Sequence, residues 1–193
     1  MMAGMISSRL RGVAVTAGGL AKLAGFSPAE CRAMEVAGLL HDLGKLAVAN
    51  EIIEKPSGLS DVEFNVIRSH AFYTHRSLQP LEKLKTINTW AALHHERLDG
   101  SSYPFHLKDK EIPSGARIIA VADVFTALTE DRPYRQGVTT EKVKPILWQM
   151  ADKRKLDKDL VARLETHSEE MDGLRHLAQQ TAAAEFHRLA TAL

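Results

Sequence analysis

The sequence predicts an all-α protein. Signals that start and stop helices recur along the whole chain, whereas runs that alternate apolar and polar residues and are rich in β-branched side chains are scarce. The 193 residues, of which 45% are hydrophobic and 25% charged, show no break in composition. A chain of this length removes roughly 70% of its unfolded surface from water when it folds. We therefore expect a single helical core.

The helices of the N-terminal half are predicted from their ends. Residues 13–24 suit a first helix, which Gly25 ends. The segments 27–30 and 60–63 both read as capping boxes, with a serine N-cap and a glutamate three residues later. The first box opens a helix that runs towards His41, and the second opens one helix that includes His70.

The helices of the C-terminal half are predicted from apolar residues at helical spacing. We expect helices around Ile87 to His94, over 114–130, around 143–150, around 160–164 and, as a polar tail, over 172–193. We accordingly divide the chain into a domain over residues 1–170 and a terminal helix over 171–193. That helix carries an apolar stripe, which either packs on the domain, forms a homodimer contact or leads to a partner domain.

The charge and cysteine content exclude several classes of protein. With 25 basic and 24 acidic residues the formal net charge is +1, which offers no global attraction to a nucleic-acid polymer or an anionic membrane. An anionic ligand must therefore be held locally. A lone cysteine, Cys31, cannot form an intramolecular disulfide, and the sequence has neither a signal-peptide pattern nor an apolar run of about 18 residues. We expect a cytoplasmic protein that does not insert into a membrane.

Histidines and carboxylates occupy positions where the helical pattern predicts burial. A buried charged group must be paired or bound to a metal to offset its desolvation, and imidazole together with carboxylate suits iron, manganese, zinc or nickel. Taken singly, each residue has an ordinary explanation, such as a satisfied core histidine or a carboxylate paired with an arginine. Together they predict a site for two metal ions. The candidate ligands are His41, Asp42, His70, His94, His95 and Asp123.

Two strings of residues resemble the signatures of a known family. Residues 41–45, His-Asp-Leu-Gly-Lys, resemble the HDxGK motif of the HD superfamily of metal-dependent phosphohydrolases. Residues 94–104 resemble the more specific HHExxDGxGYP motif of its HD-GYP branch, and segments 111–113, 116–123 and 131–135 continue the pattern in order. The resemblance covers roughly residues 13–166.

The resemblance implies a helical bundle around a metal centre, with hydrolysis of cyclic di-GMP as the usual activity. Motif matching carries over the six ligands named above, with Asp42 as the bridging and catalytic carboxylate. The implied cofactors are two divalent transition-metal ions, iron or manganese before zinc or nickel, which lower the pKa of a shared water and neutralise developing charge. The implied substrate contacts are Lys45, which is also a catalytic residue, Tyr103, Arg132 and Arg135. For the two arginines a solvated loop or an ion pair is the alternative.

Four positions depart from the family pattern. Ser102 replaces the glycine of the GYP triplet, at a cost of about 1 kcal/mol if the backbone there needs a positive φ. Met5, Arg9 and Thr126 stand where some members carry ligands to a further metal. We therefore expect two metals and no third.

Three functions remain open from the sequence. The first is hydrolysis of cyclic di-GMP or a related cyclic dinucleotide to a linear product. The second is an HD phosphohydrolase that acts on another nucleotide or phosphoester, because activated water attacks whichever ester is bound. The third is a weakly active or inactive signalling module. In each case a regulatory domain in a longer parent chain is compatible with the sequence.

Overall fold

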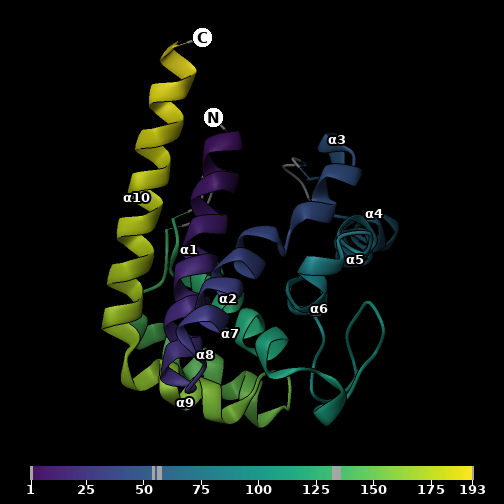
Figure 1. Ribbon diagram of the computed structural model, residues 1–193, viewed down its shortest axis with the longest axis vertical. Coiled ribbons are helices and arrows are strands. Elements are labelled where there is room, and N and C mark those ends of the chain that lie inside the picture. The colour runs from purple at the N-terminus through teal and green to yellow at the C-terminus, as the bar shows by residue number, and fades with distance from the viewer. Residues whose placement is uncertain (1, 54, 56–57, 132–135, 193) are drawn as a thin grey trace.

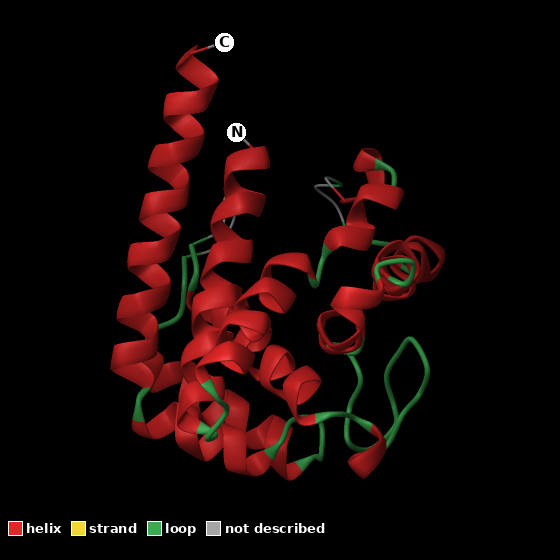
Figure 2. Cartoon of the chain, viewed as in Figure 1, coloured by secondary structure: helices red, strands yellow, loops and turns green. Residues whose placement is uncertain are grey.

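The computed structural model describes residues 2–53, 55, 58–131 and 136–192. Within these ranges the chain consists of helices joined by loops, without a strand (Figure 2). The predicted all-α class is confirmed. The α-helices are α1 (Met2–Leu23), α2 (Pro28–Leu40), α3 (Asn50–Ile53), α4 (Asp61–Arg68), α5 (His70–Leu78), α6 (Lys85–Ala92), α7 (Ser114–Thr129), α8 (Thr140–Asp152), α9 (Lys158–Thr166) and α10 (Ser168–Ala192). Short 3-10 helices are η1 (Leu43–Ala47), η2 (Glu82–Leu84) and η3 (Asp109–Glu111).

Helix α1 forms the centre of the packing. It contacts α10, α2 and α7, and the antiparallel α1–α10 pair brings the two labelled ends of the chain to the same end of the molecule (Figure 1). Among the largest fully buried side chains are Leu20 of α1, Met34 of α2, Ile118 and Phe125 of α7 and Leu164 of α9. Burying side chains of this size contributes about 1.5–3 kcal/mol each. This core fixes α7, which carries Asp123.

Both predicted capping boxes are present. The side chain of Ser27 accepts a hydrogen bond from the backbone N–H of Glu30, whose carboxylate accepts one from the N–H of Ser27, and Ser60 and Glu63 repeat the exchange. However, the expected single helix through His70 is wrong, because α4 ends before it. The Ser69 hydroxyl donates to the carbonyl of Val66 at 2.6 Å, a local bond that competes with helix continuation. As a result, His70 begins a new helix.

The terminal helices are longer than expected. Helix α1 begins at Met2 and not near residue 13, and α10 begins at Ser168 and not near residue 172. Their mutual contact accounts for both extensions, since tertiary packing stabilises helix beyond what local sequence signals. The division of the chain at residue 170 stays a prediction. In the described part of the chain, no helix combines the length and hydropathy that crossing a bilayer requires.

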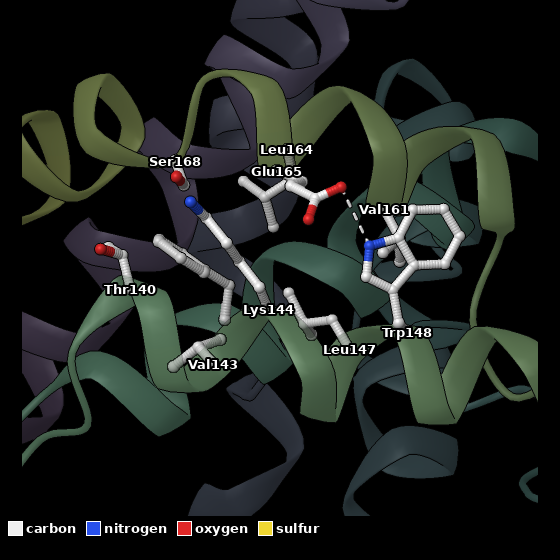
Figure 3. Close-up of a pocket in the computed structure, with 10 residues that line it drawn as sticks. Thr140, Val143, Lys144, Leu147, Trp148, Val161, Leu164, Glu165 and Ser168 are labelled. Atoms are coloured by element: carbon white, nitrogen blue, oxygen red, sulfur yellow. Dashed lines mark hydrogen bonds between the residues drawn. The ribbon is translucent and has the colours of Figure 1, made fainter.

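A small pocket between α8 and α9 is a gap in the packing (Figure 3). Its lining is largely apolar, with Val143, Leu147 and Leu164 among the lining residues. Trp148 Nε1 donates to Glu165 Oε2 at 3.0 Å across it. None of the candidate site residues that the structure describes lines this pocket.

Candidate metal centre

Four elements bring the six candidate ligands to one place. His41 and Asp42 directly follow α2, His70 begins α5, His94 and His95 follow α6, and Asp123 lies in the middle of α7. Their ligand atoms form two groups within which all atoms lie within 4.8 Å of one another. One group is His70, His94 and His95, and the other is His41, His94 and Asp123.

Asp42 connects the two groups. Its Oδ1 lies 3.2 Å from His70 Nε2, and its Oδ2 lies 3.3 Å from His41 Nε2. A single carboxylate thus faces one imidazole of each group, with one oxygen for each. This is the arrangement required of a carboxylate that bridges two cations.

Three imidazoles are oriented by the helix that precedes each of them. The Nδ1 atoms of His41, His70 and His94 lie 2.6–2.7 Å from the carbonyl oxygen three residues earlier, so each Nδ1–H donates to that carbonyl. This fixes the tautomer and leaves Nε2 with its lone pair free. All three Nε2 atoms are buried and have no hydrogen-bond partner. Buried lone pairs that face carboxylate oxygens are unfavourable by themselves and fit cations.

The electrostatics keep His94, His95 and Asp42 in metal-binding form, whereas burial is outweighed by Asp42 and Asp123, which raise the pKa of His41. Burial lowers the pKa of His95 to about 3, and burial together with His95 holds the pKa of His94 well below its ordinary value. Burial alone would raise the pKa of Asp42, but His41, His70 and Lys45 outweigh it, so this pKa is well below the usual range. Two imidazoles are therefore neutral and the carboxylate is ionised near neutral pH.

The glycine of the HDLGK string allows α5 to approach. A side chain on Gly44 would lie 2.0 Å from the carbonyl oxygen of His70 and 2.6 Å from the backbone nitrogen of Thr74. The Thr74 hydroxyl accepts from the Gly44 N–H at 2.9 Å and donates to the His41 carbonyl at 3.1 Å. These contacts set His70 against His41 and Asp42.

Two cations contact the carboxylates of the centre. Lys45 Nζ donates to Asp42 Oδ2 at 2.6 Å. Arg9 Nη2 donates to Asp123 Oδ1 at 2.9 Å, and its Nη1 lies 3.6 Å from Glu130 Oε1. Burial would raise the pKa of Asp123, but Arg9 and neighbouring imidazoles lower it far below its ordinary value. The sequence predicted Lys45 at the site, but no partner was predicted for Arg9.

Glu96 is a site residue that the sequence reasoning missed. It is buried, and its two carboxylate oxygens accept the backbone N–H groups of Phe105 at 2.6 Å and Leu107 at 3.1 Å. The loop thus held includes Tyr103, whose ring centroid lies 4.8 Å from that of His95. The signal was available: an acidic residue directly follows two candidate ligands, but local sequence does not reveal a contact nine residues away.

The serine in the GYP triplet causes no backbone strain. The backbone of Ser102 does not have a positive φ, so the energetic cost of placing a non-glycine residue at a positive φ does not arise here. The residue of this loop that needs glycine is Gly100, with φ of +73° and the Lys108 side chain 2.4 Å from where a Cβ would stand. Arg132 and Arg135, the two other expected phosphate contacts, lie outside the described residues.

The comparisons with known proteins agree with this geometry. The family described as "HD domain" matches residues 3–160. The chain belongs to this family, and its predicted resemblance to the HD-GYP branch is confirmed by its relatives.

Several curated relatives are similar over about half of the chain. A 3′3′-cGAMP-specific phosphodiesterase of Vibrio cholerae is 43% identical over 111 residues, which are 58% of this chain and 24% of that protein. A cyclic di-GMP phosphodiesterase of Pseudomonas aeruginosa is 45% identical over 103 residues, 53% of this chain and 25% of that protein. In eight curated relatives, the part that this chain matches is between 23% and 39% of the relative's length.

A solved structure shares the fold. An HDG"Y"P protein from Bdellovibrio bacteriovorus matches with a TM-score of 0.67 at 20% identity, over 85% of this chain and 52% of that one. This likeness supports the helical HD-domain architecture.

Proposed function

We propose that the protein is a metal-dependent phosphodiesterase that hydrolyses a cyclic dinucleotide, cyclic di-GMP or a relative of it, to a linear product. The observation that carries the proposal is the pair of buried ligand groups joined by Asp42. The names of the relatives, which divide between cyclic di-GMP and 3′3′-cGAMP, support this class of substrate.

The chain's own residues would bind the metals and position the ester. His41 and Asp123 would hold one ion, and His70 and His95 would hold the other. His94, whose Nε2 can bind only one ion, belongs to both groups, and Asp42 faces both. When bound, two such ions acidify water and neutralise charge on a phosphodiester. Lys45, held at Asp42, would donate to a phosphate oxygen, while Tyr103 would border the substrate. Arg132 and Arg135 remain proposed phosphate contacts on the resemblance alone.

We propose that the centre binds two metal ions and no third. Iron or manganese is preferred in this proposal over zinc or nickel. Arg9 supplies a fixed positive charge at Asp123, on the side of the centre where a further cation would stand. Thr126 of the same helix offers a hydroxyl where a carboxylate would be needed. Metal analysis should therefore give two equivalents per chain, and three equivalents would contradict the assignment.

The test of the function is a turnover assay on the purified protein with manganese or iron. Cyclic di-GMP, 3′3′-cGAMP and bis(4-nitrophenyl) phosphate would be compared by kcat/KM. We expect both cyclic dinucleotides to be substrates and at least one to be preferred over the simple ester. Hydrolysis of the simple ester alone would favour a phosphohydrolase with another substrate. Two bound metals without any turnover would favour a signalling module.

Replacement of Ser102 by Gly is expected to change kcat/KM for the preferred cyclic dinucleotide by less than about threefold, which corresponds to under 1 kcal/mol. Ser102 adopts a backbone conformation open to any residue, so glycine relieves no strain. Ser101→Gly, in the exposed neighbouring position, is the matched control. A large rise in kcat/KM for Ser102→Gly alone would show that the serine side chain obstructs the substrate.

We further propose a cytoplasmic protein whose domain works beside a regulatory domain. The relatives are longer, and one, from Xanthomonas campestris, is named a cyclic di-GMP phosphodiesterase response regulator. A homodimer through the exposed Leu177 and Leu189 of α10 is a second arrangement, which sedimentation would test.

A further inference from the structure

Arg97 carries an unpaired charge beside the metal centre. It lies two residues after His95, and its Nη1 is buried without a hydrogen-bond partner. In the described part of the chain, no carboxylate oxygen lies within ion-pair distance of its guanidinium. A buried guanidinium nitrogen without a partner is costly, and a bound anion would supply the missing acceptor.

The electrostatic neighbours of Arg97 define where its charge acts. Burial lowers the pKa of Arg97, against the opposing influence of the candidate ligand Asp123 and of Tyr103 and Asp99. Burial raises the pKa of Tyr103 to about 12, against the opposing influence of Arg97. The guanidinium therefore stands near one ligand of the centre and near the tyrosine that borders it.

A second unpaired guanidinium borders the same tyrosine. Arg68 Cζ lies 5.4 Å from the centroid of the Tyr103 ring and 4.4 Å from that of Phe64. Within the described residues, the only hydrogen bond of the Arg68 guanidinium is a long one of 3.4 Å, from its Nη1 to Asn65 Oδ1. Stacking on two aromatic faces holds the exposed guanidinium while leaving its N–H edge free.

A cyclic dinucleotide contains two phosphodiesters, and the metal centre accounts for only one. The other keeps its negative charge throughout the reaction, and the chain's net charge of +1 provides no general attraction for it. We propose that Arg97, assisted by Arg68, binds the phosphodiester that is not cleaved. This inference rests on the proposed function and adds a second anion subsite to it. Planar guanidinium forks suit phosphate oxygens, and buried charge-assisted bonds are strong.

The test compares Arg97→Met, Arg97→Lys and Arg68→Met with Arg11→Met, which removes an exposed arginine of α1 paired with Glu185. The substrates are the preferred cyclic dinucleotide, with two phosphodiesters, and bis(4-nitrophenyl) phosphate, with one. Arg97→Met should raise KM for the cyclic dinucleotide about 10- to 100-fold, and lower kcat/KM for it at least tenfold more than for the simple ester. Arg97→Lys should recover part of this loss, and Arg68→Met should show a smaller one.

A thermal melt separates binding from a structural role. Because Met removes an unpaired buried charge, Arg97→Met should melt at or above the wild-type temperature. A lower melting temperature with equal losses on both substrates would overturn the inference. Kinetics equal to those of Arg11→Met would also overturn it. If the wild type hydrolyses the simple ester but no cyclic dinucleotide, the proposed function itself fails, which is a different result.

Discussion

Replacement of Asp42 by Asn is expected to lower kcat for the preferred cyclic dinucleotide on the order of 10³-fold or more. The carboxylate of Asp42 has one oxygen 3.2 Å from His70 Nε2 and the other 3.3 Å from His41 Nε2, so it faces both halves of the centre with a separate oxygen for each. An amide of nearly the same shape is neutral and has a single acceptor oxygen. It would leave two cations without the charge that holds them together.

The measurement is kcat together with metal content for the wild type and the variant. We expect the metal content to fall below two equivalents while circular dichroism stays that of a folded helical protein. Asp152→Asn is the matched control, because Asp152 is an exposed residue of α8 paired with Lys158. Undiminished turnover by the Asp42 variant would overthrow the proposed mechanism.

Replacement of Glu96 by Ala is expected to lower the free energy of unfolding by about 2–4 kcal/mol and to raise KM. The change leaves the N–H groups of Phe105 and Leu107 without their acceptor. Each unsatisfied buried donor costs about 1–3 kcal/mol unless water reaches it. The freed loop would then present Tyr103 poorly to the substrate, whereas the metal ligands keep their places.

Urea unfolding and steady-state kinetics would measure both effects. A rise in KM that exceeds the fall in kcat is the expected signature of a displaced binding loop. Glu82→Ala, which removes an exposed glutamate of η2, is the control. Wild-type stability and KM in the Glu96 variant would show that the two backbone bonds do not hold the loop.

The sequence predicted those parts of the molecule that local rules govern. The capping boxes at Ser27 and Ser60 are local, and the inward position of Asp123 follows from helical periodicity, so both could be read before the fold was known. The six candidate ligands were found because motifs and burial patterns agree. These ligands meet at one point because of how α2, α5, α6 and α7 pack together, and this packing is seen only in the structure.

The rest depended on contacts between residues distant in sequence. Arg9 meets Asp123 across 114 positions, and no local pattern signals such a pair. Glu96 was read as part of a motif, while its partners in the following loop depend on how that loop folds back. Arg97 and Arg68 became notable only once the structure showed which arginines have carboxylate partners.

The origin of the ligands from four separate elements links metal binding to folding. No short stretch of the unfolded chain contains either ligand group, so the proposed ions would bind the native state and scarcely the unfolded one. By mass action, free metal at about 100 times its dissociation constant adds about 2.7 kcal/mol to the free energy of unfolding. With these ions bound, the midpoint of thermal unfolding would depend on the free metal concentration, and a chelator would lower it to that of the metal-free protein. Any stability quoted for it has meaning only together with the metal concentration at which it was measured.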